Sequence, residues 1–390
     1  MISVEEARRI MMEHVPVLPS LFLFPDEVSG YYLADDVVAP FDHPLFDMSA
    51  VDGYAVRGEH PWSVVGEVAA GDVFNDVLGD GECVRIFTGG QVPTSATTVV
   101  MQERCARDGN TVTYTGAPIV PGANIRRQAE SIRSGELLLT AGTLLNPAAI
   151  GAMTSVGVHQ VEVRQKPLVS ILRTGGEFID AEGVKPGRIF SSNDRMLAAA
   201  LDEQGMLEEQ SLFTSGDALN ELVPMIRAAF ENTDVLITTG GASVGEHDLV
   251  RTALERSGAT IHFHGVAQKP GKPMLFATLG NKPVFALPGN PRAVLVLFHA
   301  YVLPFLRKMQ GAHDPWPRTE QLPVSHALNV KGDRAEFRAA HVRNGRVTLL
   351  TDEGSHMLRS LIEADALAYL PPTQRTWNEG DPVEIHYLTR

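Results

Sequence analysis

Cysteines and long apolar runs are scarce in this 390-residue chain, and its net charge is negative. Its two cysteines, Cys83 and Cys105, show no metal-ligand spacing, argue against a disulfide framework and suit a reducing cytoplasm. The net charge of −14 argues against non-specific nucleic-acid binding, which needs many Lys and Arg contacts to phosphates. The most apolar run, 293–306, is too short to cross a membrane, and residues 1–14 are charged and amphipathic, unlike a signal peptide. We therefore expect a cytoplasmic protein without a nucleic-acid partner.

Motifs for several common chemistries are also missing. No Gly-x-Ser-x-Gly elbow and no Walker lysine motif occur. His262 and His264 alternate on an expected strand, but no third ligand follows at metal spacing, so we interpret them as core or pocket-lining side chains. The sequence thus offers no serine-hydrolase, P-loop or histidine-metal site.

The first 166 residues divide into two interleaved parts. Ser3 and Glu6 form a capping-box pattern, which predicts a helix from about Val4. Short β-like runs separated by Gly, Asp and Asn predict a β-rich domain over 47–131. We expect this domain to be inserted into a discontinuous N-terminal domain, which is formed by 1–46 and 132–166.

The pattern of expected strands and helices changes twice in the rest of the chain. Strand and helix patterns alternate over 167–311, which predicts a central three-layer α/β/α domain with ligand loops at the carboxyl ends of its strands. From 312 to 390 the pattern returns to strands, with a hairpin turn at Asn344-Gly345, and predicts a small β-barrel. The expected fold class is therefore α/β and multidomain.

Three Gly- and Pro-rich loops, at 239–248, 269–273 and 287–291, each follow a β-like run. Such loops offer backbone N–H groups to an anion, and a helix starting near Asp248 would add its dipole. Lys269 and Lys272 flank a Pro-Gly turn and favour the same chemistry, although two solvated lysines are the plain alternative. For Asp248 alone, simple helix capping is an equal alternative.

Other candidate residues carry less information by themselves. Pro288 and Pro291 stiffen their loop, and Asn290 is expected to cap the helix that follows. Glu177 follows a strand and could hold Mg²⁺, or it is an ordinary exposed glutamate. Asp52 lies in a turn-like stretch, and Thr88 precedes a Gly-Gly pair that is similarly ambiguous.

Taken together, these loops and further motifs resemble the molybdopterin molybdenumtransferase family, which includes the E domain of gephyrin. The match runs nearly end to end, and the number and order of the motifs make it specific. The matching segments are 47–55, 66–71, 86–103, 122–126, 187–193, 239–248, 269–273, 287–291 and 354–355.

The resemblance implies an elongated, four-domain subunit that forms a homodimer. Members transfer molybdenum from molybdate to molybdopterin. They take adenylylated molybdopterin, delivered by molybdopterin adenylyltransferase as the upstream partner, and hydrolyse the adenylate with Mg²⁺.

The resemblance also implies roles for individual residues. Those expected at the pterin–nucleotide phosphates are Gly240, Gly241, Ser243 and Asp248. Those expected at molybdate are Lys269, Lys272, Arg338 and Ser355, with Pro288, Asn290 and Pro291 as the pocket wall. Glu177 would complete the cleft, together with Asp52 and Thr88 reaching in from the partner subunit. Those expected to be catalytic are Asp52, Glu177, Asp248 and Lys269, of which Glu177 and Asp248 would hold Mg²⁺.

Four positions depart from the family pattern, and each removes a charge from the expected cleft. Carboxylates are missing at Ser131 and Gly176, a basic residue at Gly265, and an aspartate at Ser215 unless Asp217 replaces it. In an electrostatically organised site each loss can cost about 2–4 kcal/mol.

These losses keep a second hypothesis open beside the enzyme. It is a catalytically degraded, gephyrin-like dimeric scaffold that binds a peptide of a membrane or cytoskeletal (cell-division) protein. The groove for that peptide would use Pro371, Pro372 and Trp377, which core packing explains equally well.

Overall fold

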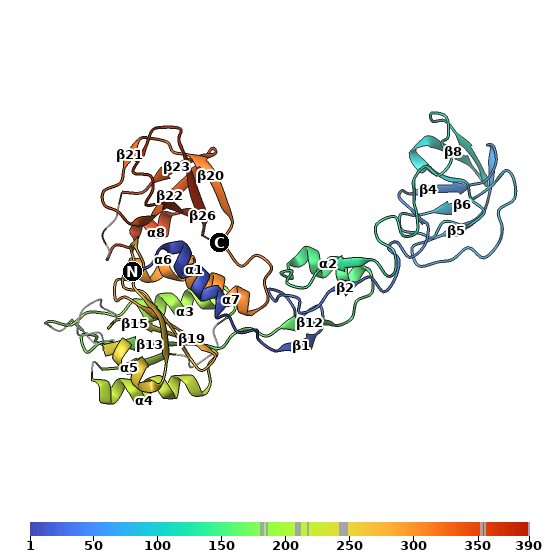
Figure 1. The fold of residues 1–390 in the computed structure, drawn as a ribbon. Coiled ribbons are helices and arrows are strands. Elements are labelled where there is room, and N and C mark those ends of the chain that lie inside the picture. Colours follow the sequence, from blue (N-terminus) through green and yellow to red (C-terminus); the bar gives the residue numbers. More distant parts are fainter. Residues whose placement is uncertain are drawn as a thin grey trace.

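The protein is elongated (Figure 1). An α/β sheet and a β-barrel lie at one end, a β-rich unit lies at the other, and a narrow arm joins them. This computed structural model describes residues 1–179, 183–184, 186–206, 212–216, 218–241, 249–351, 354 and 356–388. The expected α/β multidomain class is confirmed.

The central sheet has six strands. Four of them are parallel, and an antiparallel pair forms one edge. Parallel strands covered on both faces are buried along their length, as β13 and β15 are here, although a few of their buried residues are polar. In spatial order the strands are β14 (Leu212–Ser215), β13 (Val169–Thr174), β15 (Val235–Thr239), β19 (Lys282–Leu287), β18 (Leu275–Leu279) and β16 (Thr260–His264).

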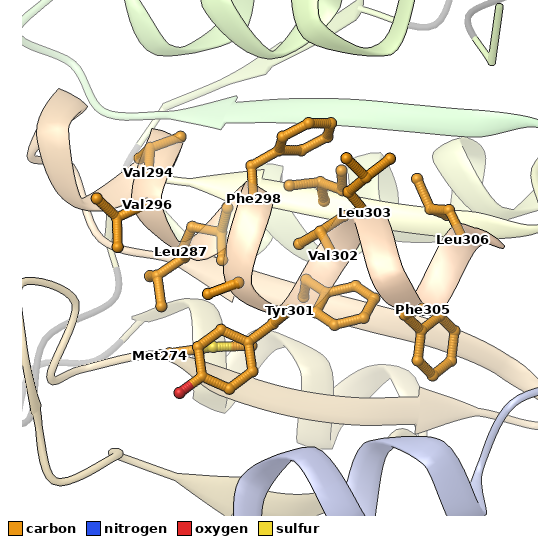
Figure 2. Packing of buried hydrophobic residues seen from close by; sticks show 14 of the residues in the cluster. Met274, Leu287, Val294, Val296, Phe298, Tyr301, Val302, Leu303, Phe305 and Leu306 are labelled. Carbon is orange, nitrogen blue, oxygen red and sulfur yellow. The ribbon is translucent and has the colours of Figure 1, made fainter. Parts of the chain in front are cut away.

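Helices cover both faces of this sheet (Figure 1). Side chains alternate between the faces, so that Ile171 packs with one cluster of buried residues and Leu172 with the other. Figure 2 shows part of the larger cluster, in which Tyr301 lies beside Met274. On that face are α3 (Asn193–Glu203), α6 (Pro291–Leu297), a π-helical turn (Phe298–Val302) and α7 (Leu303–Met309). On the other are α4 (Leu219–Glu231) and α5 (Leu249–Ser257).

Helix α1 (Val4–Glu13) forms where the capping box predicts it, and the Ser3 hydroxyl accepts the N–H of Glu6 at 3.1 Å. Its position is different from the expected one. Val4 and Met11, with Leu18 after the helix, are buried in the larger core cluster of the α/β domain. Although the sequence places 1–46 in the N-terminal domain, the apolar stripe of α1 is covered by the α/β domain, near α7.

Replacing Met11 tests whether α1 is part of that core. Met11 is fully buried, so Met11→Ala should lower the free energy of unfolding by about 2–5 kcal/mol. Met12, on the next position of the helix, is only partly buried, and Met12→Ala should cost clearly less. Denaturant titration measures both; equal, small losses would mean that α1 is only loosely attached.

The arm is built from segments on both sides of the insertion. Strand β1 (Ser20–Leu23) pairs with β12 (Val161–Arg164), and β2 (Val37–Val38) pairs with β11 (Leu137–Leu139). Helix α2 (Pro147–Ser155) covers them, and the Asn146 side chain caps it by accepting the N–H of Ala149. These non-local pairs make a small core of their own.

The remote unit holds a six-stranded sheet with two small cores, one on each face. Its strand order is β7 (Thr98–Met101), β4 (Gly53–Val56), β6 (Glu82–Ile86), β5 (Trp62–Val68), β9 (Thr111–Tyr114) and β8 (Cys105–Asp108), with a 3-10 turn at Gln102–Arg104. The pair β3 (Met48–Ser49) and β10 (Ile125–Arg126) lies where the chain enters and leaves this unit.

The C-terminal strands form the expected small barrel. Its strands are β23 (Arg346–Leu349), β22 (Ala335–Arg343), β24 (Ala366–Leu370), β26 (Pro382–Tyr387) and β20 (Thr319–Pro323), closed by a bridge between Val324 and Val347. The short pieces β17 (Gln268–Lys269), β21 (Leu328–Asn329), β25 (Thr376–Trp377) and α8 (Arg359–Glu363) complete it.

Trp377 is buried in the barrel core, so the hypothesis that it lines a peptide groove is wrong. None of the helices in the described part of the chain combines the length and apolarity needed to span a bilayer.

Candidate functional site

Three loops meet at the carboxyl edge of the parallel strands. β13, β15 and β19 are neighbours, so the turns after Thr174, Thr239 and Leu287 lie side by side. Gly240 has a φ of +86°, and a Cβ atom there would lie 2.4 Å from the carbonyl oxygen of Thr174. Only glycine permits this approach, which makes the edge a surface of bare backbone.

Polar side chains of α3 hold this edge in place. The Asn193 amide donates to the carbonyl oxygen of Gly289 at 2.8 Å, and its own Oδ1 is buried without a partner among the described residues. Next to it, Asp194 pairs with Arg173 at 3.5 Å while both side chains are largely buried. Asn193 ends the matching segment 187–193 but was given no role there, and no pattern in the sequence singles out Asp194 or Arg173.

A cationic pocket of about 370 Å³ opens beside this edge, between the α/β domain and the barrel. Among the described residues that line it are five cations and one carboxylate, Glu336. The Lys-Pro-Gly-Lys-Pro turn forms one wall, and Pro288 and Asn290 connect the pocket to the carboxyl edge. The five cations are Lys269, Lys272, Arg292, Arg334 and Arg338.

Glu336 organises two of these cations. It is 4 % exposed, its Oε2 accepts from Nε and Nη2 of Arg338 at 2.8 and 2.7 Å, and its Oε1 lies 3.9 Å from Nζ of Lys269. The parallel pairing of β17 with β22 sets Lys269 opposite Glu336. Because that pairing is non-local, no local pattern in the sequence points to Glu336.

Two more arginines of the pocket were also missed. Arg292, in the first turn of α6, is almost fully buried, and its Nη1 donates to Ser360 at 2.6 Å. Arg334 donates to the carbonyl oxygen of Gln268 at 3.2 Å. Both are held by fixed partners, so their charges are in place before any ligand arrives.

The structure brings several predicted residues together. Lys269, Lys272, Pro288, Asn290 and Arg338 all line the pocket. Pro291 opens α6 directly behind it. Asn290 does occupy the N-cap position, but its side chain makes no capping hydrogen bond, so that part of the prediction is wrong.

Other predicted residues lie at the carboxyl edge or outside the described chain. Gly240 and Gly241 follow β15 at the edge. Glu177 is exposed on the loop after β13, and its carboxylate folds back over Gly175. Ser243, Asp248 and Ser355, like Asp217, lie outside the described residues.

Asp52 and Thr88 lie in the remote β-rich unit, so within one chain they do not reach the pocket (Figure 1). The backbone N–H and hydroxyl of Thr88 donate to Oδ1 of Asp52 at 2.8 and 2.7 Å. These hydrogen bonds hold the pKa of Asp52 below its usual value. The pair is therefore a fixed, ionised carboxylate on an exposed surface.

The structure also locates three of the positions that depart from the family pattern. Ser131 lies near the arm, bonded to the backbone of His43, and Gly176 precedes Glu177. Gly265 has a φ of +94°, and its carbonyl accepts the N–H of Ile2. A basic side chain there would meet Met1, so glycine suits the attachment of the N-terminal segment. Within the described ranges no three His, Cys, Asp or Glu side chains gather as a metal site.

Comparisons with known proteins agree along the whole chain. Residues 2–157 match the MoeA N-terminal region (domain I and II), residues 170–308 a probable molybdopterin binding domain, and residues 321–388 the MoeA C-terminal region (domain IV).

Individual proteins are similar over nearly the full length. A molybdopterin molybdenumtransferase from Nostoc sp. is 36 % identical over 381 residues, covering 92 % of this chain and 87 % of the relative. One from Staphylococcus aureus (strain COL) is 30 % identical over 405 residues, covering 98 % and 95 %. The crystal structure of molybdopterin biosynthesis MoeA protein from Pyrococcus horikoshii OT3 matches with a TM-score of 0.84, 28 % identity and full coverage of both chains. This chain belongs to the molybdopterin molybdenumtransferase family.

Proposed function

We propose that this protein is a molybdopterin molybdenumtransferase, which uses molybdate and adenylylated molybdopterin as substrates and hydrolyses the adenylate in a Mg²⁺-dependent step. The observation that carries the proposal is the pocket in which five cations surround one buried carboxylate. Such an excess of positive charge, in a chain of net charge −14, suits a doubly charged oxyanion and explains how an acidic protein binds one.

The carboxyl edge supplies the second half of this proposal. The backbone at Gly240 and Gly241 is the natural place for the phosphates of the nucleotide, because glycine lets them approach the main chain. The turn at Pro288 joins this edge to the cationic pocket. One bound substrate would therefore extend from the edge to the molybdate, and the protein would hold the two reacting groups close together in a suitable orientation.

The metal requirement of this proposal is modest. Mg²⁺ typically takes one or two protein carboxylates together with substrate phosphates. Glu177 fits that requirement because it is exposed beside the glycine edge, and Asp248 is the second expected ligand. When bound there, Mg²⁺ would neutralise charge on the phosphates. Lys269 and Lys272 would hold molybdate, and Arg338 would keep its position through Glu336.

We further propose that the protein works as a cytoplasmic homodimer, with Asp52 and Thr88 of one copy facing the pocket of the other. Their distance from the pocket within one chain requires a second copy if they act there at all. The arm exposes apolar side chains that a second copy would cover, among them Phe22 at 64 % exposed. Free Cys83 and Cys105 suit a reducing compartment. The exposed apolar side chains of segment 22–45 are Phe22, Phe24, Val38, Phe41 and Leu45.

Turnover tests the proposal directly. Purified protein mixed with adenylylated molybdopterin, Mg²⁺ and molybdate should release AMP and form molybdenum cofactor, measured by chromatography and by activation of a cofactor-free molybdoenzyme. Omitting molybdate or Mg²⁺ should abolish cofactor formation. Nucleotide binding without AMP release above background would replace the enzyme with the scaffold hypothesis.

A further inference from the structure

A second cavity, of about 630 Å³, lies away from the cationic pocket, where three parts of the chain meet. Its walls come from α1, from the linker at 314–319 and from strands β20 and β26 of the barrel. Cavities of this size at a junction between domains commonly bind small molecules. Nothing in the proposed transferase reaction uses this one.

Arg8 is the unusual residue in this cavity. Its guanidinium lies 4.9 Å from the ring centre of Trp316 and 5.7 Å from that of Tyr301. Its Nε and Nη2 are buried and have no hydrogen-bond partner among the described residues. By contrast Arg9, the next residue of the helix, is exposed and pairs with both Glu6 and Glu13. Arg8 is only partly buried, but buried N–H atoms without an acceptor are costly, and a bound carboxylate would supply one.

Glu5 and Glu384 lie close enough to Arg8 to interact electrostatically with it, but their hydrogen bonds go to other groups. Glu5 accepts the hydroxyl of Tyr369 at 2.6 Å. Glu384 lies 2.7 Å from Nε2 of His386, and this hydrogen bond holds the pKa of Glu384 below its usual value. His386 is itself 4 % exposed, and its other ring nitrogen, Nδ1, is buried without a partner in the described chain. Arg8 and His386 both line the cavity, and both have buried nitrogen atoms without a hydrogen-bond partner in the described chain.

The charge around the cavity limits the class of ligand. Asp314 and Glu384 also line it, together with a second arginine, Arg318, which pairs with Glu320 at 3.4 Å. The two carboxylates balance the two arginines, so the cavity has no excess of positive charge to hold a doubly charged phosphate. A single carboxylate matches the planar guanidinium and adds one negative charge only. The Trp316 ring offers an apolar surface beside it. We propose that this cavity binds a small organic monocarboxylate, with its carboxylate at Arg8 and its apolar part against Trp316.

Sodium benzoate is the probe that tests this site on the full chain. Calorimetric titration should show saturable binding, while benzyl alcohol, which has the same ring without the charge, should bind at least about tenfold more weakly. Arg8→Met should weaken benzoate binding about tenfold or more, and the matched change Arg9→Met should leave it within about twofold. If Arg8→Met does not fold, Arg8→Lys replaces it. This variant keeps the positive charge but loses the planar pair of N–H donors, so it should bind benzoate severalfold more weakly than the unmodified protein.

Tryptophan fluorescence places the probe. Trp62 and Trp377 are buried in other cores, so the response to benzoate should disappear in Trp316→Phe. It should persist in Lys269→Ala, which separates this site from the cationic pocket and from the fate of the proposed activity. The proposal is overturned if the unmodified protein shows no saturable binding or if folded Arg8 variants bind benzoate unchanged. It is also overturned if inorganic phosphate changes the Trp316 fluorescence at lower concentrations than benzoate does.

Discussion

Lys269→Ala should weaken molybdate binding about tenfold while the protein keeps its fold. Lys269 is half exposed in the lining of the cationic pocket, so solvent partly screens the attraction between its charge and the ligand. The side chain contributes little packing, and Arg338 still pairs with Glu336 when it is removed. The free energy of unfolding should therefore change by less than about 1 kcal/mol. Calorimetric titration with molybdate and denaturant unfolding measure the two quantities.

Lys331→Ala is the matched control, because Lys331 is an exposed lysine outside the pocket. It removes the same charge from the chain, so any effect of net charge alone appears in both variants. A large loss of stability in Lys269→Ala with unchanged molybdate affinity would show that the lysine serves the structure and not the ligand.

Gly240→Ala should be the most damaging single change at the carboxyl edge. Alanine would have to adopt a φ near +86° with its Cβ 2.4 Å from the carbonyl oxygen of Thr174, so β13 and β15 must separate at their ends. We expect a loss of about 2–4 kcal/mol in unfolding free energy and a loss of nucleotide binding. Thermal or denaturant unfolding and a nucleotide titration measure these effects.

Gly280→Ala separates backbone strain from collision. Gly280 also has a left-handed φ, +61°, but no atom lies within 4 Å of a Cβ placed there. This variant should cost only about 1–2 kcal/mol and leave nucleotide binding intact. If both variants lower the free energy of unfolding equally, the close approach of Gly240 to Thr174 contributes nothing to the cost of an added Cβ.

Local pattern was sufficient to predict most of the fold. Strand β15 was predicted at its observed bounds, and the capping box located α1, because these signals lie within a few residues of each other. The packing partner of α1 could not be predicted in this way. Its apolar stripe shows that one face is buried but not which surface covers it, so α1 was assigned to the arm instead of the α/β core.

The site was predictable only in part, for the same reason. Lys269 and Lys272 stood out because prolines and a glycine fix their turn. Glu336 and Arg292 did not, because a lone glutamate on a strand and a lone arginine in a helix have no distinctive local pattern. Only the pairing of β17 with β22 and the burial of α6 give these charges their neighbours.

The placement of α1 has a consequence for biogenesis. Glu5 bonds to Tyr369 across 364 positions of sequence, and Met11 shares a core with Phe337. During translation this helix is made long before the barrel that covers it, so its apolar stripe stays without a lasting partner while the arm and remote unit are completed. The turns of this helix are thus synthesised well before the barrel and are buried only after it, which makes them a natural segment for a chaperone to hold.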